Sequence, residues 1–170
     1  RPWGFILFAR NVRNAAQLTA LTADLRESVG YDAPVLIDQE GGRVQRMRGP
    51  IWREWKPPLD QAQQGGPRAM ELRYRLIAAE LRAVGVDVNC APTADVARVD
   101  THPFLRNRLY GDDPAHVVEV AQSVAAGLLA GGVLPVVKHM PGHGAAVADS
   151  HKGLPAVDLA RDILDAIDFN

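Results

Sequence analysis

The chain has 170 residues, 47% of them hydrophobic and 23% charged, and a formal net charge of −1 at pH 7. This length is sufficient for one domain with a sizeable core, and the composition is that of a soluble globular protein. The near-neutral charge gives no reason to expect nucleic acid or an anionic membrane as a partner, and no apolar run approaches the roughly 18 residues of a spanning helix. A single cysteine, Cys90, fits a reducing compartment, so we expect a cytoplasmic protein.

Strands and helices alternate along the chain. Four segments have the length and apolar character of buried strands: residues 3–10, 33–39, 86–92 and 133–139. The helices predicted around them cover residues 14–29, 67–84, 115–132 and 158–170. Asn14 is the expected N-cap of the first helix and Gly30 its stop, whereas residues 49–67 are predicted to be irregular.

This alternation predicts parallel βαβ units with right-handed crossovers. Each predicted strand ends in polar residues, namely Arg10–Asn11, Asp38, Asn89 and Lys138–His139. Because sites of parallel α/β folds form at the carboxyl ends of strands, these residues are expected to share one rim. A closed (β/α)₈ barrel takes about 250 residues. The four or five strands available here therefore form either a smaller open α/β domain or an incomplete barrel.

The segment "KHMPGHGAAVADSH", residues 138–151, holds three of the five histidines of the chain. Asp149 and His151 are two residues apart, so in an extended loop the carboxylate approaches the imidazole, an arrangement suited to proton transfer near neutral pH. A surface turn capped by Asp149 is the alternative. A metal site formed by His139, His143, Asp149 and His151 has weaker support, because Pro141 and Gly142 disfavour the helix that such spacing needs.

Lys138 and His139 end a strand whose apolar residues Val136 and Val137 are expected to be buried, so Lys138 needs a partner. That partner is either a substrate hydroxyl or carbonyl, or a neighbouring acid such as Asp38. In "DQEGGRVQR", a strand-end Asp38 with a nearby Arg46 suits a polar neutral ligand such as a sugar, and a glycine turn with solvated arginines is the alternative.

Arg106 and Arg108 lie in a long loop, which is compatible with either a functional or a solvated role. Cys90 is interpreted as a buried structural thiol.

Three motifs resemble those of glycoside hydrolase family 3, specifically its bacterial β-N-acetylglucosaminidases. These are "IDQEGGRVQRM", "NCAPTADV" with "RNRLYGDDP", and "KHMPGHGAAVADSH", which stand in the order of the family and cover nearly the whole chain. The resemblance implies a (β/α)₈ TIM barrel, no cofactor and no metal. It implies His151 as general acid/base and Asp149 as its orienting partner. The substrate-binding set that it implies is Asp38, Arg46, Arg108, Lys138 and His139.

The resemblance further implies a retaining hydrolase that removes terminal β-linked N-acetylglucosamine from cell-wall fragments such as muropeptides in the cytoplasm. The aspartate nucleophile of the family lies in a later segment that has no counterpart here, and the first barrel strand also has none. We therefore expect residues 1–170 to be a single α/β catalytic-domain fragment whose open sheet edge invites self-association. A non-catalytic sugar-binding module and, with less support, a metal-dependent hydrolase are the alternatives.

Overall fold

The computed structural model describes residues 1–148 and 153–169. Its main sheet has four strands, all parallel, in the order β1-β2-β5-β6: β1 (Phe5–Leu7), β2 (Val35–Ile37), β5 (Val88–Asn89) and β6 (Leu134–Pro135). A two-stranded antiparallel sheet is formed by β3 (Gln39–Gly41) and β4 (Val44–Gln45). The helices are η1 (Ala9–Asn11), α1 (Ala15–Val29), α2 (Pro58–Arg82), α3 (Pro103–Arg106), α4 (Pro114–Ala130) and α5 (Arg161–Ile167).

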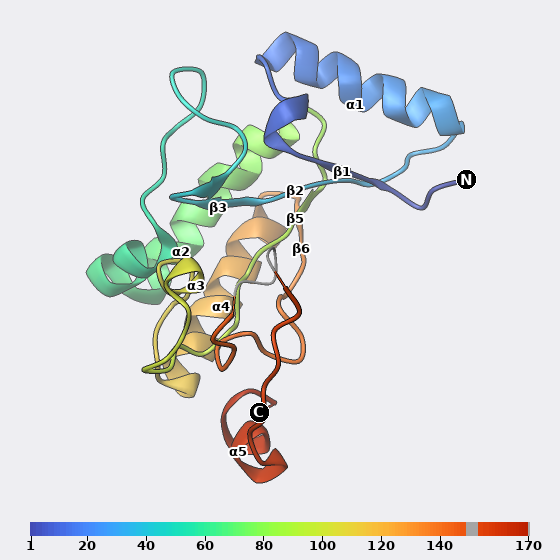
Figure 1. The fold of residues 1–170 in the computed structure, drawn as a ribbon. Helices are drawn as coiled ribbons and strands as arrows, with labels where there is room; N and C mark the ends of the chain where they lie inside the picture. Colours follow the sequence, from blue (N-terminus) through green and yellow to red (C-terminus); the bar gives the residue numbers. More distant parts are fainter. Residues whose placement is uncertain (149–152, 170) are drawn as a thin grey trace.

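The four parallel strands follow one another in chain order across the sheet. A doubly wound sheet would reverse its order at a switch point, whereas a barrel adds each strand next to the previous one. The α/β prediction is therefore confirmed, and the strand order favours part of a barrel over a doubly wound open sheet. Figure 1 shows α2 and α4 beside each other along the strands, with α5 set apart near the C-terminus.

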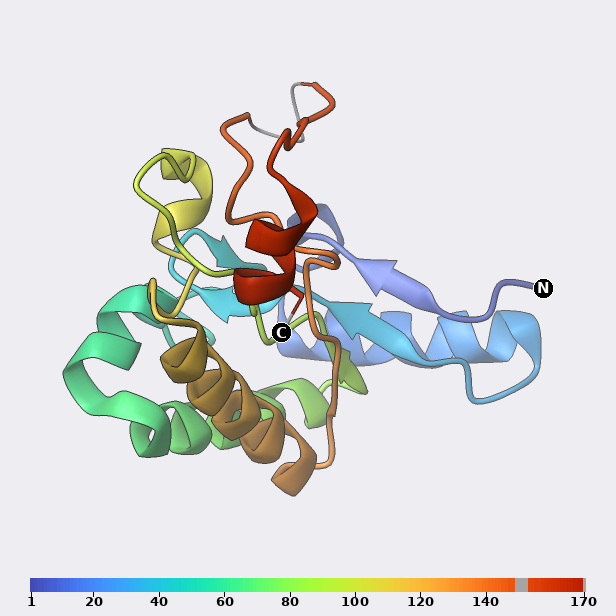
Figure 2. The same ribbon diagram turned by 90° about the horizontal axis from the view of Figure 1, so that it is seen from below.

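The first βαβ unit has the caps expected from the sequence. The Asn14 side chain accepts a hydrogen bond from the Gln17 backbone N–H at 2.9 Å, and Gly30 ends α1 in the left-handed conformation at φ 72°. Thr22 joins this helix to the segment between α2 and β5, because its hydroxyl donates to the Val84 carbonyl at 2.9 Å. Figure 2 shows α1 beside β1 and β2.

Two expectations for residues 33–84 were wrong in detail. The second strand is shorter than predicted and is followed at once by the β3–β4 hairpin, because Gly41 and Gly42 both take positive φ. The helix predicted from Pro67 is present, because Gly66, at φ 62° and ψ −166°, breaks the helical backbone just before Pro67, but a helical segment that was not predicted runs from Pro58 up to this break. Two helical segments thus meet at a kink in the stretch that was expected to be irregular.

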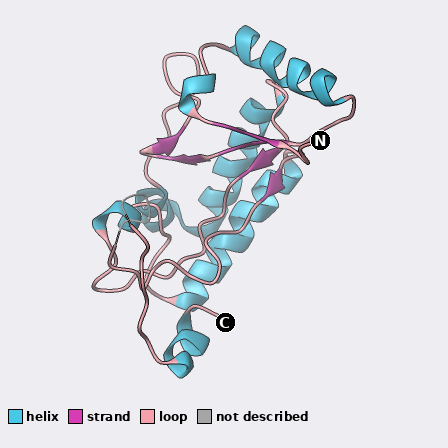
Figure 3. Ribbon diagram, turned by 45° about the vertical axis from the view of Figure 1, so that its right-hand side comes forward, coloured by secondary structure: helices cyan, strands magenta, loops and turns pink. Residues whose placement is uncertain are grey.

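The last strand is also shorter than predicted. Among the described strands β6 pairs only with β5, through Leu134 and Pro135. An isolated parallel bridge between Thr93 and Lys138 follows further along the same two segments. The core lies between the strands and the long helices (Figure 3). Ile37, Leu18, Ile77 and Val124 are fully buried in it. No helix among residues 1–148 and 153–169 combines the length and the apolar character required to cross a membrane.

Candidate functional site

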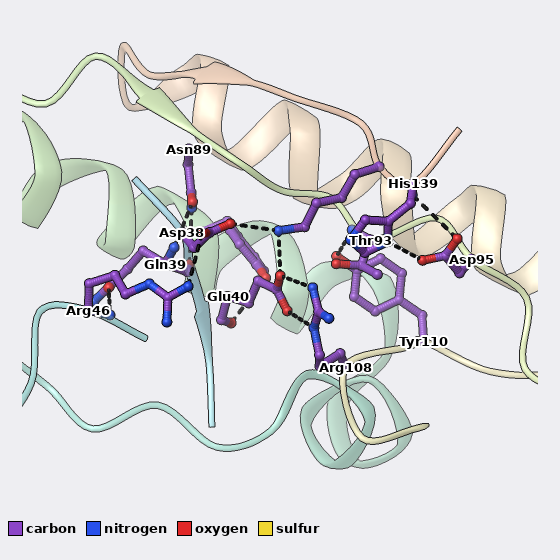
Figure 4. Close-up of polar contacts among 12 residues, drawn as sticks. Asp38, Gln39, Glu40, Arg46, Asn89, Thr93, Asp95, Arg108, Tyr110 and His139 are labelled. Atoms are coloured by element: carbon purple, nitrogen blue, oxygen red, sulfur yellow. Dashed lines mark hydrogen bonds and ion pairs between the residues drawn. The ribbon is translucent and has the colours of Figure 1, made fainter. Parts of the chain in front are cut away.

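Polar side chains meet where the parallel strands end, as expected for Asp38 and Lys138. Lys138 Nζ lies 2.9 Å from Asp38 Oδ1, and Arg46 Nη2 donates to Asp38 Oδ2 at 3.0 Å. Burial by itself would raise the pKa of Asp38, but Lys138 and Arg46 outweigh it and hold this pKa below its ordinary value. Asp38 is therefore an ionised acceptor fixed from two sides (Figure 4).

Glu40 lies at the centre of this cluster and was missed by the sequence reasoning. Its side chain is only 1% exposed. Arg108 donates two hydrogen bonds to the Glu40 carboxylate, from Nε to Oε2 at 2.9 Å and from Nη2 to Oε1 at 2.8 Å. Lys138 Nζ lies 2.5 Å from Oε1. The spacing gave a usable signal, because residues two apart on an extended segment point to the same side, as Asp38 and Glu40 do here.

The backbone of Glu40 is held equally firmly. Arg73 Nη2 donates to the Glu40 carbonyl at 2.5 Å, and the Tyr74 hydroxyl donates to the same oxygen at 3.1 Å. Burial raises the pKa of Tyr74 to about 12, so this donor stays protonated. A Cβ on Gly41 would lie 1.9 Å from Arg73 Nη2, which explains why glycine follows Glu40.

His139 is held by a second buried carboxylate, Asp95, which the sequence reasoning also missed. Asp95 Oδ2 lies 2.6 Å from His139 Nδ1, and Asp95 Oδ1 accepts from the His143 backbone N–H at 2.7 Å. Burial would raise the pKa of Asp95, but the hydrogen bond and charge of His139 and the backbone donors lower it. The peptide bond that joins Lys138 to His139 is cis.

Other polar strand ends have local roles. Asn89 accepts a hydrogen bond from the Gln39 backbone N–H and donates one to the Gln39 carbonyl, both at 3.0 Å, which ties β5 to β3. Asn11 accepts from the Phe8 backbone N–H, and the Arg10 guanidinium lies over the Phe8 ring. Arg10 and Asn11 thus make local contacts after β1, and their sharing one rim with the other three strand ends stays a prediction.

The remaining candidate residues of the sequence also have defined surroundings. Arg106 donates to the carbonyls of Arg98 and Val99 and so braces its own loop, while Arg43 lies over the Phe104 ring at 3.8 Å. Cys90 is buried, as expected, and burial raises the pKa of its thiol. These contacts give Arg106 and Cys90 structural roles.

Asp149 and His151, the residues expected to transfer protons, lie outside the described residues. Two histidines of the weaker metal hypothesis are described: the His139 and His143 rings meet edge to face with their centroids 5.7 Å apart. Within residues 1–148 and 153–169, no group of three or more histidine, cysteine or acidic side chains is arranged to hold a metal ion.

A cavity of about 1220 Å³ opens beside Lys138 and His139. It is bordered by α4, by residues 137–142 and by the end of α5, where Asp168 pairs with Arg98. Of the ion-paired cluster, Lys138 borders this cavity, whereas Asp38, Glu40, Arg46 and Arg108 do not line it.

Comparison with known proteins agrees with this geometry. Residues 3–170 match the family model described as the glycosyl hydrolase family 3 N-terminal domain. A β-hexosaminidase of Methylococcus capsulatus is 40% identical over 95% of this chain and 50% of its own length. A β-hexosaminidase of Bordetella avium is 39% identical over 94% of this chain and 48% of its own length.

A solved structure extends the likeness to the fold. NagZ from Neisseria gonorrhoeae, in complex with N-trifluoroacetyl-D-glucosamine, superposes with a TM-score of 0.88 at 32% identity, over 98% of this chain and 51% of that one. The chain thus spans about half the length of the relatives that it matches. Together with the strand order, the family match confirms a fold of the (β/α)₈-barrel type, of which four parallel strands are described.

Proposed function

The chain belongs to glycosyl hydrolase family 3, and we propose that it forms the sugar-binding and acid/base part of a retaining β-N-acetylglucosaminidase. By family it is a glycosidase, and its relatives from Methylococcus and Bordetella are β-hexosaminidases. The observation that carries the proposal is the fixed cluster of Asp38, Lys138 and Arg108 at the strand ends.

The cluster keeps unused hydrogen-bonding capacity on the groups that a sugar would meet. A carboxylate offers about four lone-pair positions, and the protein contacts of Asp38 with Lys138 and Arg46 use two of them. An ammonium has three donors, and Lys138 directs two of them at Asp38 and Glu40. Adjacent hydroxyls of one pyranose ring can therefore donate to Asp38 and accept from Lys138.

The ligand class follows from relatives of the same family. The Neisseria gonorrhoeae protein is bound to N-trifluoroacetyl-D-glucosamine, a close analogue of N-acetylglucosamine. We therefore propose terminal β-linked N-acetylglucosamine as the glycone, carried by muropeptide fragments of the cell wall, and a cytoplasmic location.

For the chemical step we propose the roles that the sequence motif implies. His151 would protonate the leaving oxygen and, in the second half-reaction, deprotonate the attacking water, with Asp149 orienting its ring. The nucleophile would come from a later segment of the family, outside residues 1–170. The 170-residue chain by itself is then expected to bind the sugar and to hydrolyse little or none of it.

Sugar binding without turnover is therefore a second candidate function. It is favoured by the state of the three carboxylates in the cluster, since Asp38, Glu40 and Asp95 are each bonded to cationic side chains or to a histidine. A carboxylate held in this way is poorly placed to attack an anomeric carbon.

Calorimetric titration with N-acetylglucosamine, alongside hydrolysis of a chromogenic β-N-acetylglucosaminide, tests both candidates. In Asp38→Ala we expect at least about tenfold weaker binding, because a hydrogen bond to a charged group contributes about 1.5–3 kcal/mol. Asp24→Ala, on the exposed side of α1, should bind as the unaltered chain does. Undetectable binding by the unaltered chain would contradict the sugar-binding proposal, and turnover would contradict the assignment of the nucleophile to a later segment.

We also propose that residues 1–170 behave as one α/β unit that self-associates through its open sheet edge. Of the described strands, β6 is an edge strand, and Leu134 within it and Val137 just after it expose more than half of their surface. Light scattering coupled to size exclusion should give a mass above the 18.4 kDa of one chain, and Val137→Lys should lower it.

A further inference from the structure

Asp95 is a buried carboxylate directly behind one of the proposed sugar-binding residues. Its side chain has 0% exposed surface, whereas that of its partner His139 is 34% exposed. Asp95 therefore cannot contact a ligand in the cavity, but the ring that it holds can. Figure 4 shows the two side chains directed toward one another.

The two oxygens of Asp95 have different partners. Oδ1 accepts from the backbone N–H groups of His143, at 2.7 Å, and of His139, at 3.3 Å. Oδ2 is left for the ring of His139, 2.6 Å from Nδ1. The backbone contacts fix the carboxylate in place, so the direction of its second oxygen is determined before any ligand arrives.

The bonding determines which ring nitrogen carries the proton. The three contacts keep Asp95 ionised, in line with its lowered pKa, and an ionised carboxylate can only accept hydrogen bonds. Nδ1 of His139 must therefore be the donor. In a neutral imidazole, the other nitrogen, Nε2, is then an acceptor.

An acceptor at this place differs from the groups around it. Lys138, Arg46 and Arg108 can only donate hydrogen bonds. The carboxylates of Asp38 and Glu40 already accept from these cations. Within residues 1–148 and 153–169, Nε2 of His139 makes no hydrogen bond. It is thus available to a hydroxyl that enters the cavity bordered by His139.

We infer that Asp95 is a positioning residue that fixes His139 with its proton on Nδ1, so that Nε2 accepts a hydrogen bond from a ligand hydroxyl. The ligand part of this inference rests on the proposed sugar-binding function. The proton on Nδ1 of His139 does not, because it follows from the protein contacts alone.

Nitrogen-15 NMR of the histidine rings tests the tautomer in the labelled 170-residue chain at alkaline pH, where the neutral ring is observed. His139 is assigned by its loss in His139→Gln. We expect a protonated Nδ1 and an unprotonated Nε2 in the unaltered chain, and a mixture of tautomers in Asp95→Ala. Asp100→Ala, in an exposed part of the same loop, should leave the His139 signals unchanged.

The measurement on the unaltered chain remains decisive even if Asp95→Ala fails to fold. A His139 ring protonated on Nε2 alone, or on both nitrogens, would overturn the inference, and so would an unchanged tautomer in folded Asp95→Ala.

Affinity for N-acetylglucosamine gives the second readout. Loss of one neutral hydrogen bond should weaken binding by about 2- to 10-fold in Asp95→Ala. Unaltered affinity in a variant with mixed tautomers would refute the role of Nε2 in binding. If the unaltered chain shows the expected tautomer and binds no sugar, the proposed function fails while the role of Asp95 toward His139 stands.

Discussion

Replacement of Glu40 by glutamine should strongly destabilise the chain. Glu40 is 1% exposed and is the acceptor of both Arg108 bonds and of one Lys138 contact. Removing one member of a buried ion pair costs about 3–5 kcal/mol, because the other charge is left buried without compensation. Lys138 retains Asp38 in the variant, and the glutamine oxygen can still accept one of the two Arg108 bonds, so we expect the lower end of this range, about 3 kcal/mol.

Urea unfolding followed by circular dichroism gives the free energy of unfolding directly, and thermal unfolding should show a Tm lowered by about 6–12 °C for a chain of this size. Glu54→Gln is the matched control, since Glu54 also pairs with an arginine, Arg48, but these side chains are 54% and 44% exposed. It should change stability by less than about 1 kcal/mol.

A double variant separates the cost of leaving the Arg108 charge uncompensated from the other effects of replacing Glu40. If the cost arises from the uncompensated Arg108, then Glu40→Met combined with Arg108→Met should be more stable than Glu40→Met alone. The reasoning would be refuted if Glu40→Gln lost no more stability than Glu54→Gln, or if the double variant were less stable than both single ones.

Three further outcomes follow from single sites. Gly127→Ala should lower the free energy of unfolding, measured with urea, by about 1–3 kcal/mol, because its Cβ would lie 2.2 Å from the Glu71 carbonyl where α4 meets α2. Gly153→Ala, whose Cβ would meet nothing within 4 Å, should leave it unchanged. The pKa of Asp38 in the folded chain lies below its ordinary 3.8, so its stabilising contribution is present above pH 3.8 and is lost as the pH falls through the lower folded value. The free energy of unfolding of Asp38→Asn, measured with urea at stepped pH, should therefore fall less in acid than that of the unaltered chain. Cys90 is buried with a raised pKa, so it should react more slowly with a disulfide reagent at pH 8 than the urea-unfolded chain does, and equal rates would contradict its burial.

The sequence was sufficient for features that depend on a few neighbouring residues. Asn14 and Gly30 marked the ends of α1 because a cap acts on the turn beside it, and apolar runs of strand length marked the four parallel strands, although β6 leaves Leu134 exposed. The strand-end positions of Asp38 and Lys138 followed in the same way. Their meeting across the sheet edge needed only the assumption of parallel strands.

Only the tertiary structure decided which side chains support the site. Glu40 meets Arg108 across a separation of 68 residues, and Asp95 meets His139 across 44. No local pattern encodes such a pair, because each partner is selected by the path of the loops between them. Gly66 likewise interrupts α2 through its own backbone angles, which propensity alone does not determine. The sequence thus determined the scaffold and the residues at its rim, and the packing of distant segments determined the carboxylates that hold them.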